Sequence, residues 1–202
     1  MTVYVESNFV LELALLQEEQ SDCTTLLELA ESVAITLVLP AFSIGEPYEN
    51  WVRRIKSRRD LHGALSGQIH ELSRSQPYQA SANELRPLTD LLLRSGEEEK
   101  RRLDSALERI LSCAQVAVLD LKALRSSLQL QNTRSLSPQD SLVYASILEH
   151  LREAGHPTSC FITKDKDFLN PDIESDLDAL GCKLLTRFKA GLGYTRSQLN
   201  KD

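Results

Sequence analysis

The sequence predicts an α/β fold: a parallel sheet of about five strands with helices on both faces, plus an α-helical insertion. Three observations predict this class. Short segments rich in β-branched residues alternate with helical segments along the chain. Residues 34–39 are apolar without interruption, as expected for a strand that helices cover on both sides. Residues 50–112 hold leucine and isoleucine at helical spacing, with many charges between them.

The predicted elements follow one another in a regular order. Strands are predicted at residues 2–6, 34–39, 115–119, 158–163 and 183–188. Helices are predicted at residues 9–16, 22–32, 121–130 and 138–154. The insertion at 50–112 is interpreted as three or four helices, with breaks at 75–83 and 94–99, and the glycine-containing tail at 189–202 is expected to be loose. Residues 1–202 are interpreted as a single domain with this insertion.

Composition limits the classes of function. The chain has 202 residues and a net charge of −6, which argues against a broad surface that coats nucleic acid but permits a local basic patch. Its four cysteines form no C-x-x-C pair, so buried reduced thiols are favoured over a zinc site. No apolar run approaches the ~18 residues that cross a membrane, and the first strand leaves no room for a signal peptide. A cytoplasmic protein without a membrane partner is expected.

Acidic residues fall at one topological position. Glu6 ends the first strand, Glu46 follows the second, and Asp165 follows the fourth with Asp167 close behind. Asp140 lies in the first turn of a predicted helix. The carboxyl ends of parallel strands form the ligand crevice of open α/β sheets, so these acids are expected to converge there.

Converging carboxylates repel one another unless a cation lies between them. Mg²⁺ prefers oxygen ligands, binds through a few carboxylates together with substrate phosphate, and lowers the pKa of bound water. The pattern therefore predicts Mg²⁺- or Mn²⁺-dependent hydrolysis of phosphodiesters. No glycine pattern for nucleotide hydrolysis or dinucleotide binding is present.

Each acid also has a structural interpretation. Ser137, Pro138 and Asp140 form a pattern typical of a helix N-terminus, in which Asp140 is a capping residue. Glu46 suits an exposed helix face, and Glu6 suits an exposed strand end. Asp165 and Asp167 suit an ordinary turn.

Four motifs resemble the PIN-domain nucleases, specifically the larger PIN-like proteins with a helical insertion. The motifs are VYVESNFVLELAL (3–15), LPAFSIGE (39–46), LSPQDSLVYASIL (136–148) and CFITKDKDF (160–168). The resemblance implies a Mg²⁺- or Mn²⁺-dependent endonuclease acting mainly on RNA. It implies that the catalytic residues are Glu6, Glu46, Asp140 and Asp165, that the metal ligands are Glu6, Asp140, Asp165 and Asp167, and that Asn8 and Thr163 support them.

Two departures from the family pattern motivate a second hypothesis. The family usually has Asp where this chain has Glu6, and Pro47 directly follows Glu46, so that helix is expected to start or kink near Pro47. The leading hypothesis is an endoribonuclease, either the toxin of a toxin–antitoxin pair or an RNA-processing or defence enzyme. The alternative is a catalytically lapsed PIN-like module that binds RNA or a protein. An inhibitory antitoxin-like protein and a second copy of the chain are the other partners considered.

A basic stretch follows the second acid. Its members are Arg53, Arg54, Lys56, Arg58 and Arg59. One interpretation is an RNA-binding edge that contacts phosphates, and the other is a solvated face that pairs with nearby acids. Tyr48 and Trp51 are interpreted either as platforms for an unpaired base or as core anchors.

Overall fold

The structure is a computed structural model that describes residues 1–155 and 158–201. It contains one five-stranded sheet in the order β3-β2-β1-β4-β5, and all four strand pairings are parallel. The strands are β1 (Thr2–Val5), β2 (Thr36–Pro40), β3 (Gln115–Ala117), β4 (Ser159–Ile162) and β5 (Cys182–Leu185). The predicted α/β class is thus confirmed, and the carboxyl ends of all five strands lie at one edge of the sheet with β1 at its centre.

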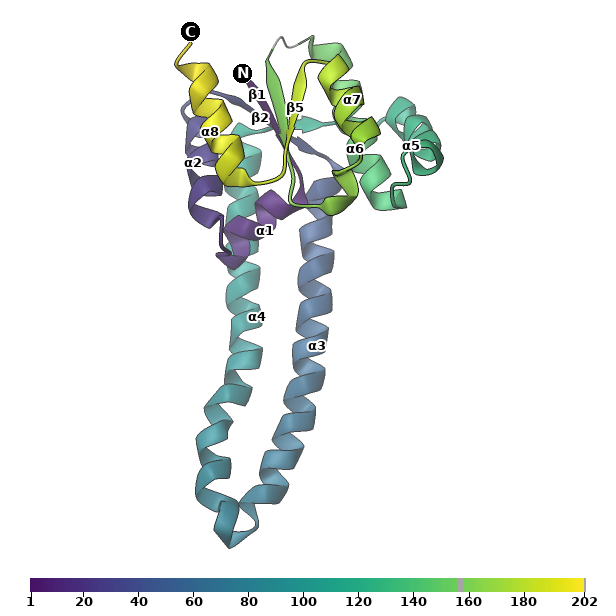
Figure 1. Cartoon of the computed structure of the whole chain (residues 1–202). Coiled ribbons are helices and arrows are strands. Elements are labelled where there is room, and N and C mark those ends of the chain that lie inside the picture. Colours follow the sequence, from purple (N-terminus) through teal and green to yellow (C-terminus); the bar gives the residue numbers. More distant parts are fainter. Residues whose placement is uncertain (156–157, 202) are drawn as a thin grey trace.

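Helices cover both faces of this sheet (Figure 1). They are α1 (Ser7–Leu15), α2 (Gln20–Glu31), α3 (Phe42–Ser73), α4 (Gln79–Cys113), α5 (Leu121–Thr133), α6 (Pro138–Ala154), α7 (Pro171–Ala179) and α8 (Phe188–Leu199). Two 3-10 turns, η1 (Gln76–Tyr78) and η2 (Lys166–Phe168), complete the described elements. Helices α1, α2 and α8 pack on one face together with the last turns of α4, and α5, α6 and α7 pack on the other.

Alternation along the strands produces two cores. Val3 and Val5 of β1 point into the cluster beneath α1, α2 and α4, whereas Tyr4 between them points into the cluster beneath α6. All three side chains are fully buried. A central strand that is apolar on both faces is typical of a parallel sheet between two helical layers. This packing fixes the strand end from which Glu6 emerges.

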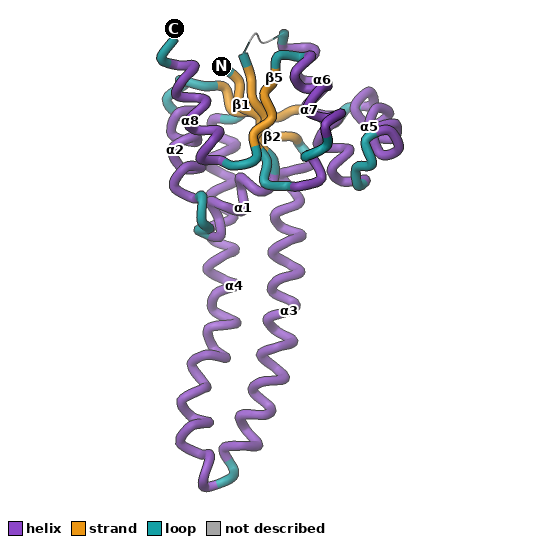
Figure 2. The backbone as a smooth tube through the Cα atoms, viewed as in Figure 1, coloured by secondary structure: helices purple, strands orange, loops and turns teal. Residues whose placement is uncertain are grey.

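The helical insertion differs from the sequence expectation. It consists of two long helices, α3 and α4, which run side by side away from the sheet (Figures 1 and 2). The expected break at 75–83 corresponds to η1, but the break expected at 94–99 is wrong because α4 continues through it. The reason is Gly96, where an added Cβ would lie 2.0 Å from Cδ1 of Ile55. This glycine allows the two helices to approach closely and does not end one.

The C-terminal tail is also more ordered than expected. Residues 189–199 belong to α8, whose Phe188 and Leu192 are buried in the core, so a loose tail is the wrong interpretation for this segment. Gly191 again serves close packing, since a Cβ there would lie 2.2 Å from Cδ1 of Ile162 in β4. Residue 202 lies outside the described residues. None of the helices within residues 1–155 and 158–201 is both long enough and apolar enough to cross a membrane.

Candidate active site

The sheet edge brings together segments that are far apart in sequence. Glu6 directly follows β1, and Asp165 lies three residues beyond the end of the neighbouring β4. Glu46 is in the second turn of α3, which begins soon after β2, and Asp140 is in the first turn of α6. All four predicted acids therefore lie at the carboxyl edge, which is where ligand sites of open α/β sheets form.

Glu6 is the most buried of these acids, with 3% of its surface exposed. Its Oε2 accepts hydrogen bonds from the Asn8 backbone N–H at 2.7 Å and from the Ser7 hydroxyl at 3.0 Å, so Glu6 is the N-cap of α1. Its Oε1 accepts from the Thr163 hydroxyl at 3.1 Å. Burial raises the pKa of Glu6 to about 7, although the hydrogen bonds from Asn8, Ser7 and Thr163 lower it in part.

Thr163 links the ends of β1 and β4. While its hydroxyl donates to Glu6, the same oxygen accepts from the backbone N–H of Asp165 at 2.9 Å. Asp165 in turn caps η2, because its Oδ1 accepts from the backbone N–H of Asp167 at 2.9 Å. Asp165 is half-buried and Asp167 is exposed. The two acids therefore form a turn, as one interpretation predicted. The Asp165 carboxylate nevertheless lies at the carboxyl edge of the sheet.

Asp140 has the contacts of a residue at a helix N-terminus, as one of its two interpretations predicted. Ser137 is the N-cap of α6 and accepts from the Asp140 backbone N–H at 3.1 Å, and the Ser137 hydroxyl also donates to Oδ2 of Asp140. Asp140 is half-buried. The pair forms one half of a capping box, because the Asp140 carboxylate accepts from the Ser137 hydroxyl and not from its backbone N–H. The contact with Ser137 uses Oδ2 of Asp140, and Oδ1 takes no part in it.

Glu46 reaches the site from α3 despite the proline that follows it. The helix begins at Phe42 and passes through Pro47, so it neither starts at nor ends beside the proline. Pro47 lacks an N–H and removes one backbone bond to the preceding turn. Glu46 remains half-buried, and burial raises its pKa while the nearby Ser7 hydroxyl opposes the shift. Ser7 thus contacts both Glu6 and Glu46.

Electrostatic coupling shows which acids share one environment. The pKa of Glu46 is raised by burial and further by the charges of Asp140, Asp165 and Glu49. The pKa of Asp140 is raised by burial and by the charges of Asp165 and Asp167, with Ser137 opposing the shift. A carboxylate whose pKa is raised by neighbouring negative charges is stabilised in its charged form by a bound cation. Glu46, Asp140 and Asp165 form the coupled set, and Glu6 joins it through Ser7 and Thr163.

The donor chemistry fits a hard divalent cation, because the coupled groups supply only carboxylate oxygens. The carboxylates are farther apart than the ligands of a single bound ion. Within residues 1–155 and 158–201, no three acidic, histidine or cysteine side chains lie close enough to hold one ion. Both oxygens of Glu6 are already hydrogen-bonded. Glu46, Asp140 and Asp165 are each half-buried at this edge of the sheet.

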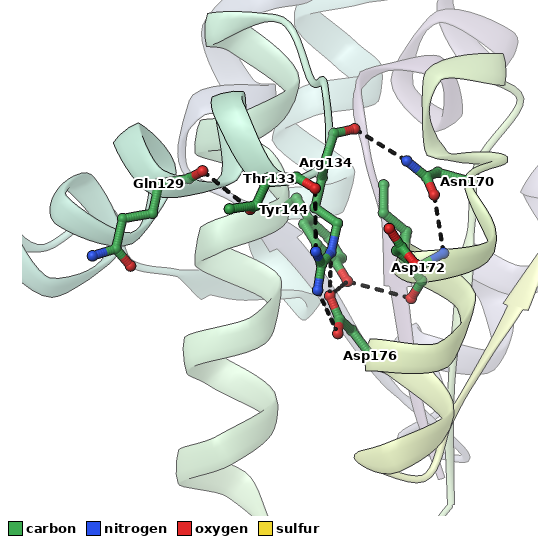
Figure 3. A network of polar contacts seen from close by, with 8 residues as sticks. Gln129, Thr133, Arg134, Tyr144, Asn170, Asp172 and Asp176 are labelled. Atoms are coloured by element: carbon green, nitrogen blue, oxygen red, sulfur yellow. Dashed lines mark hydrogen bonds and ion pairs between the residues drawn. The ribbon is translucent and has the colours of Figure 1, made fainter.

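A polar network anchors the segment that leads into Asp140 (Figure 3). The Arg134 guanidinium donates to both carboxylate oxygens of Asp176 on α7, at 2.8 and 3.0 Å. Asn170 donates through Nδ2 to the Arg134 carbonyl at 3.2 Å, and its Oδ1 accepts from the backbone N–H of Asp172, which caps α7. Asn170 lies two residues after the end of η2. The network therefore ties the segment carrying Asp165 to the segment preceding Asp140.

The predicted basic stretch divides between two roles. Arg58 donates to both oxygens of Glu99 at 2.8 and 2.9 Å, so it joins α3 to α4 and is not free to contact phosphate. Arg53 and Lys56 are exposed and, among the described residues, form no ion pair. Arg53 lies seven residues after Glu46, two helical turns along the same side of α3. Arg54 is half-buried beside α1, and Arg59 is exposed.

The aromatic residues of α3 are structural anchors. Tyr48 donates to Asp104 at 2.7 Å, Trp51 donates to the Gly96 carbonyl at 2.9 Å, and both rings pack against the core. The Lys100 ammonium lies over both rings. Of the two interpretations of Tyr48 and Trp51, core anchoring is the one that these contacts support.

The sequence did not predict the contacts that Ser7, Arg134 and Asn170 make at or near the site. Ser7 had no signal, because a serine in the first turn of a helix is ordinary. Asn170 had a partial signal, since Asn-Pro at 170–171 predicts a helix start with an asparagine cap. Its second contact, to the Arg134 carbonyl, depends on tertiary structure.

Comparison with known proteins gives one match. A family model described as a PIN domain matches residues 3–168, which include every acid of the candidate site and both helices of the insertion. No curated protein and no solved structure matches the chain.

Proposed function

The chain belongs to the PIN domain family, a family of nucleases, and from this premise we propose that it is a Mg²⁺- or Mn²⁺-dependent endoribonuclease. The observation that carries the proposal is that Glu46, Asp140 and Asp165, which are far apart in sequence, lie together at the carboxyl edge of the sheet, where the charges of Asp140 and Asp165 raise the pKa of Glu46. Carboxylates gathered at one place destabilise one another's charged forms, and a bound cation removes that cost.

Each acid has a role in this proposal. Glu46, Asp140 and Asp165 hold the metal and its waters, and Asp167 at the exposed rim completes the set. Glu6 orients Ser7 and Thr163, and it comes into reach of the metal only if it gives up one of these contacts. A bound Mg²⁺ or Mn²⁺ would neutralise the phosphate and lower the pKa of a water molecule. Arg53 and Lys56 would hold the RNA backbone along α3.

The test is cleavage of total cellular RNA by the purified chain with Mn²⁺ or Mg²⁺, and with EDTA as a control. Asp140→Asn and Asp165→Asn are expected to reduce the rate by about 100-fold or more, since each removes a charge that would face the metal. Glu153→Gln is the matched control, because Glu153 is exposed at the other end of α6. Metal-dependent cleavage that survives in Asp165→Asn would refute the site.

The second candidate is a module that binds RNA or a protein without catalysis. The observation in its favour is that Glu6 is fully engaged as a helix cap, with both oxygens hydrogen-bonded. It predicts no calorimetric binding of Mn²⁺. A binding isotherm that disappears in Asp140→Asn would count against it.

The biological role proposed is that of a toxin paired with an antitoxin-like protein, or of an RNA-processing or defence enzyme in the cytoplasm. The neighbouring reading frames distinguish these roles. A small reading frame directly beside this one, whose product binds the chain and blocks cleavage, would support the toxin. If no adjacent product inhibits cleavage, RNA processing or defence is favoured.

A further inference from the structure

Lys164 stands between Thr163 and Asp165, in the segment that leaves β4. Its ammonium forms an ion pair with Glu12 on α1, where Nζ lies 2.5 Å from Oε1. The side chain of Lys164 is 33% exposed and that of Glu12 only 1%. A carboxylate so completely removed from water is costly unless a cation and hydrogen bonds compensate it. Among the residues that the structure describes, Lys164 is the only cation paired with Glu12, so the pair holds the lysine side chain in one place.

Glu12 is itself held by the helical layer around it. Its Oε2 accepts from the backbone N–H of Glu19 at 2.8 Å, just before α2. The Glu19 carboxylate accepts from the backbone N–H of Phe188 at 2.6 Å, at the start of α8. The anchor thus belongs to α1, α2 and α8 together, whose apolar side chains form one core. A carboxylate bonded in this way has little freedom to follow Lys164 if the chain beyond β4 moves.

Thr163 and Lys164 hold the chain from opposite faces of the sheet. Alternation along β4 places Phe161 in the core beneath α6 and Ile162 in the core beneath α1 and α2. Thr163 continues on the first side, where its hydroxyl donates to the carboxylate that follows β1, and Lys164 continues on the second. The backbone that enters Asp165 is therefore bonded on both sides.

The segment beyond Asp165 is less firmly attached. The two residues that follow it are exposed, and the next buried side chain is that of Phe168. The Asp165 carboxylate caps η2 through one oxygen, so it supports this turn and takes no support from a distant element there. The direction in which this carboxylate leaves the chain is thus set mainly by the two bonded residues before it.

We propose that the ion pair of Lys164 and Glu12 positions Asp165. It fixes the exit of β4 so that this carboxylate faces the acids of α3 and α6. This role rests on the proposed function, in which Asp165 is a metal ligand, and both Lys164 and Glu12 act through it. Replacing a buried ion pair by uncharged side chains is often neutral for stability, so the principal effect of the pair is the arrangement that it fixes. Loss of residues that orient metal ligands typically lowers metal affinity by about 10–100-fold.

The test removes both charges at once. Glu12→Gln keeps an oxygen that can accept from the Glu19 N–H, and Lys164→Met keeps a long side chain, so the double variant leaves no buried charge unpaired. Calorimetry measures Mn²⁺ affinity without RNA, and NMR measures hydrogen exchange of the backbone amides. In the double variant we expect the dissociation constant for Mn²⁺ to rise by about tenfold or more. The Asp165 amide is expected to exchange at least about tenfold faster.

The matched control is the ion pair between Arg109 of α4 and Glu31 of α2, in the same helical layer. The guanidinium lies 3.0 Å from each carboxylate oxygen, and no acid of the candidate site belongs to either helix. Arg109→Met combined with Glu31→Gln is expected to change neither Mn²⁺ affinity nor exchange of the Asp165 amide. In every variant the Phe161 amide within β4 is expected to keep its rate, because it reports opening of the sheet and not of its exit.

Three results would overturn the inference. The first is native exchange of the Asp165 amide in the double variant, which would show that the exit keeps its position without the pair. The second is a loss in Lys164→Met alone that adding Glu12→Gln restores, which would reduce the effect to an unpaired buried carboxylate. The third is faster exchange with unchanged Mn²⁺ affinity in a native chain that does bind Mn²⁺.

The nuclease proposal fails separately if the native chain binds no Mn²⁺. Exchange of the Asp165 amide then still decides whether Lys164 and Glu12 position this residue. Faster exchange in the double variant, with a native rate in the Arg109 and Glu31 control, supports the inference, and an unchanged rate overturns it.

Discussion

Thr163 and Glu6, which are 157 residues apart in the chain, are joined by a hydrogen bond of 3.1 Å between the threonine hydroxyl and Oε1 of the carboxylate. The bond connects the ends of the two adjacent strands β1 and β4 beneath the candidate site. Because the same hydroxyl accepts from the Asp165 backbone, one side chain holds the position of two acids.

Thr163→Val tests this link, because valine keeps the shape of threonine and removes the hydroxyl. It leaves Oε1 of Glu6 and the Asp165 N–H without this partner in a buried position. We expect the free energy of unfolding to fall by about 1–3 kcal/mol, and RNA cleavage to fall more than stability alone explains. Denaturant unfolding and cleavage rates measure the two effects. Thr25→Val, the control, removes an exposed hydroxyl that is bonded to its own helix and should change neither stability nor cleavage. If Thr25→Val and Thr163→Val had equal effects, the link between Thr163 and the two acids would be contradicted.

The buried carboxyl of Glu6 predicts how stability depends on pH. Its pKa is about 7 in the folded chain against an ordinary value of 4.5, so between these pH values the folded state binds more protons than the unfolded state. The contribution to stability is therefore complete below pH 4.5 and is lost as pH rises through 7. Its full size is about 3 kcal/mol.

Glu6→Gln removes this titration. We expect the difference in unfolding free energy between pH 5 and pH 8, measured in EDTA, to shrink by up to about 3 kcal/mol. The absolute stability at pH 5 is expected to fall, because an amide cannot accept every bond that Glu6 accepts. Glu18→Gln, at a residue whose side chain is 85% exposed, is the control. An unchanged pH difference in Glu6→Gln would show that Glu6 does not titrate in this range.

The strands and the four acids were predictable from the sequence because both depend on local patterns. Apolar β-branched runs define the strands, and the α/β order places the residues that follow them at one edge. The contacts within the site were not predictable, since Ser7 reaches Glu46 and Asn170 reaches Arg134 only through the tertiary fold. Gly96 was misread because a glycine that ends a helix and one that admits a neighbouring side chain look alike in sequence.

Asn170 predicts a coupling between the two acid-bearing segments. Asn170→Ala removes both the cap of α7 and the bond to the Arg134 carbonyl, whereas Asn170→Asp keeps an acceptor for the cap and loses the donor. We expect Asn170→Ala to cost about 1 kcal/mol and Asn170→Asp less than that. Both should raise the Mn²⁺ concentration for half-maximal cleavage severalfold, because the segment before Asp140 is released. A normal metal requirement in Asn170→Asp would reduce the network to a helix cap.

Gly96 predicts the effect of a single methyl group between the long helices α3 and α4. In Gly96→Ala the new Cβ would lie 2.0 Å from Cδ1 of Ile55 and 3.3 Å from its Cγ1, so Ile55 must move. We expect the free energy of unfolding to fall by about 1–3 kcal/mol. Ile55→Val removes Cδ1 alone, and in the double variant it should restore part of the loss, since the closest contact is gone.

Gly67→Ala is the matched control for this cycle. Gly67 lies in α3 with nothing within 4 Å of its added Cβ, so alanine there should stabilise the helix by up to about 1 kcal/mol. Thermal unfolding of the four variants and the native chain gives the coupling energy between positions 55 and 96. If the changes in unfolding free energy of Gly96→Ala and Ile55→Val simply add in the double variant, the new methyl group and Cδ1 do not meet. The two helices would then be farther apart at this level than the contact between Gly96 and Ile55 requires.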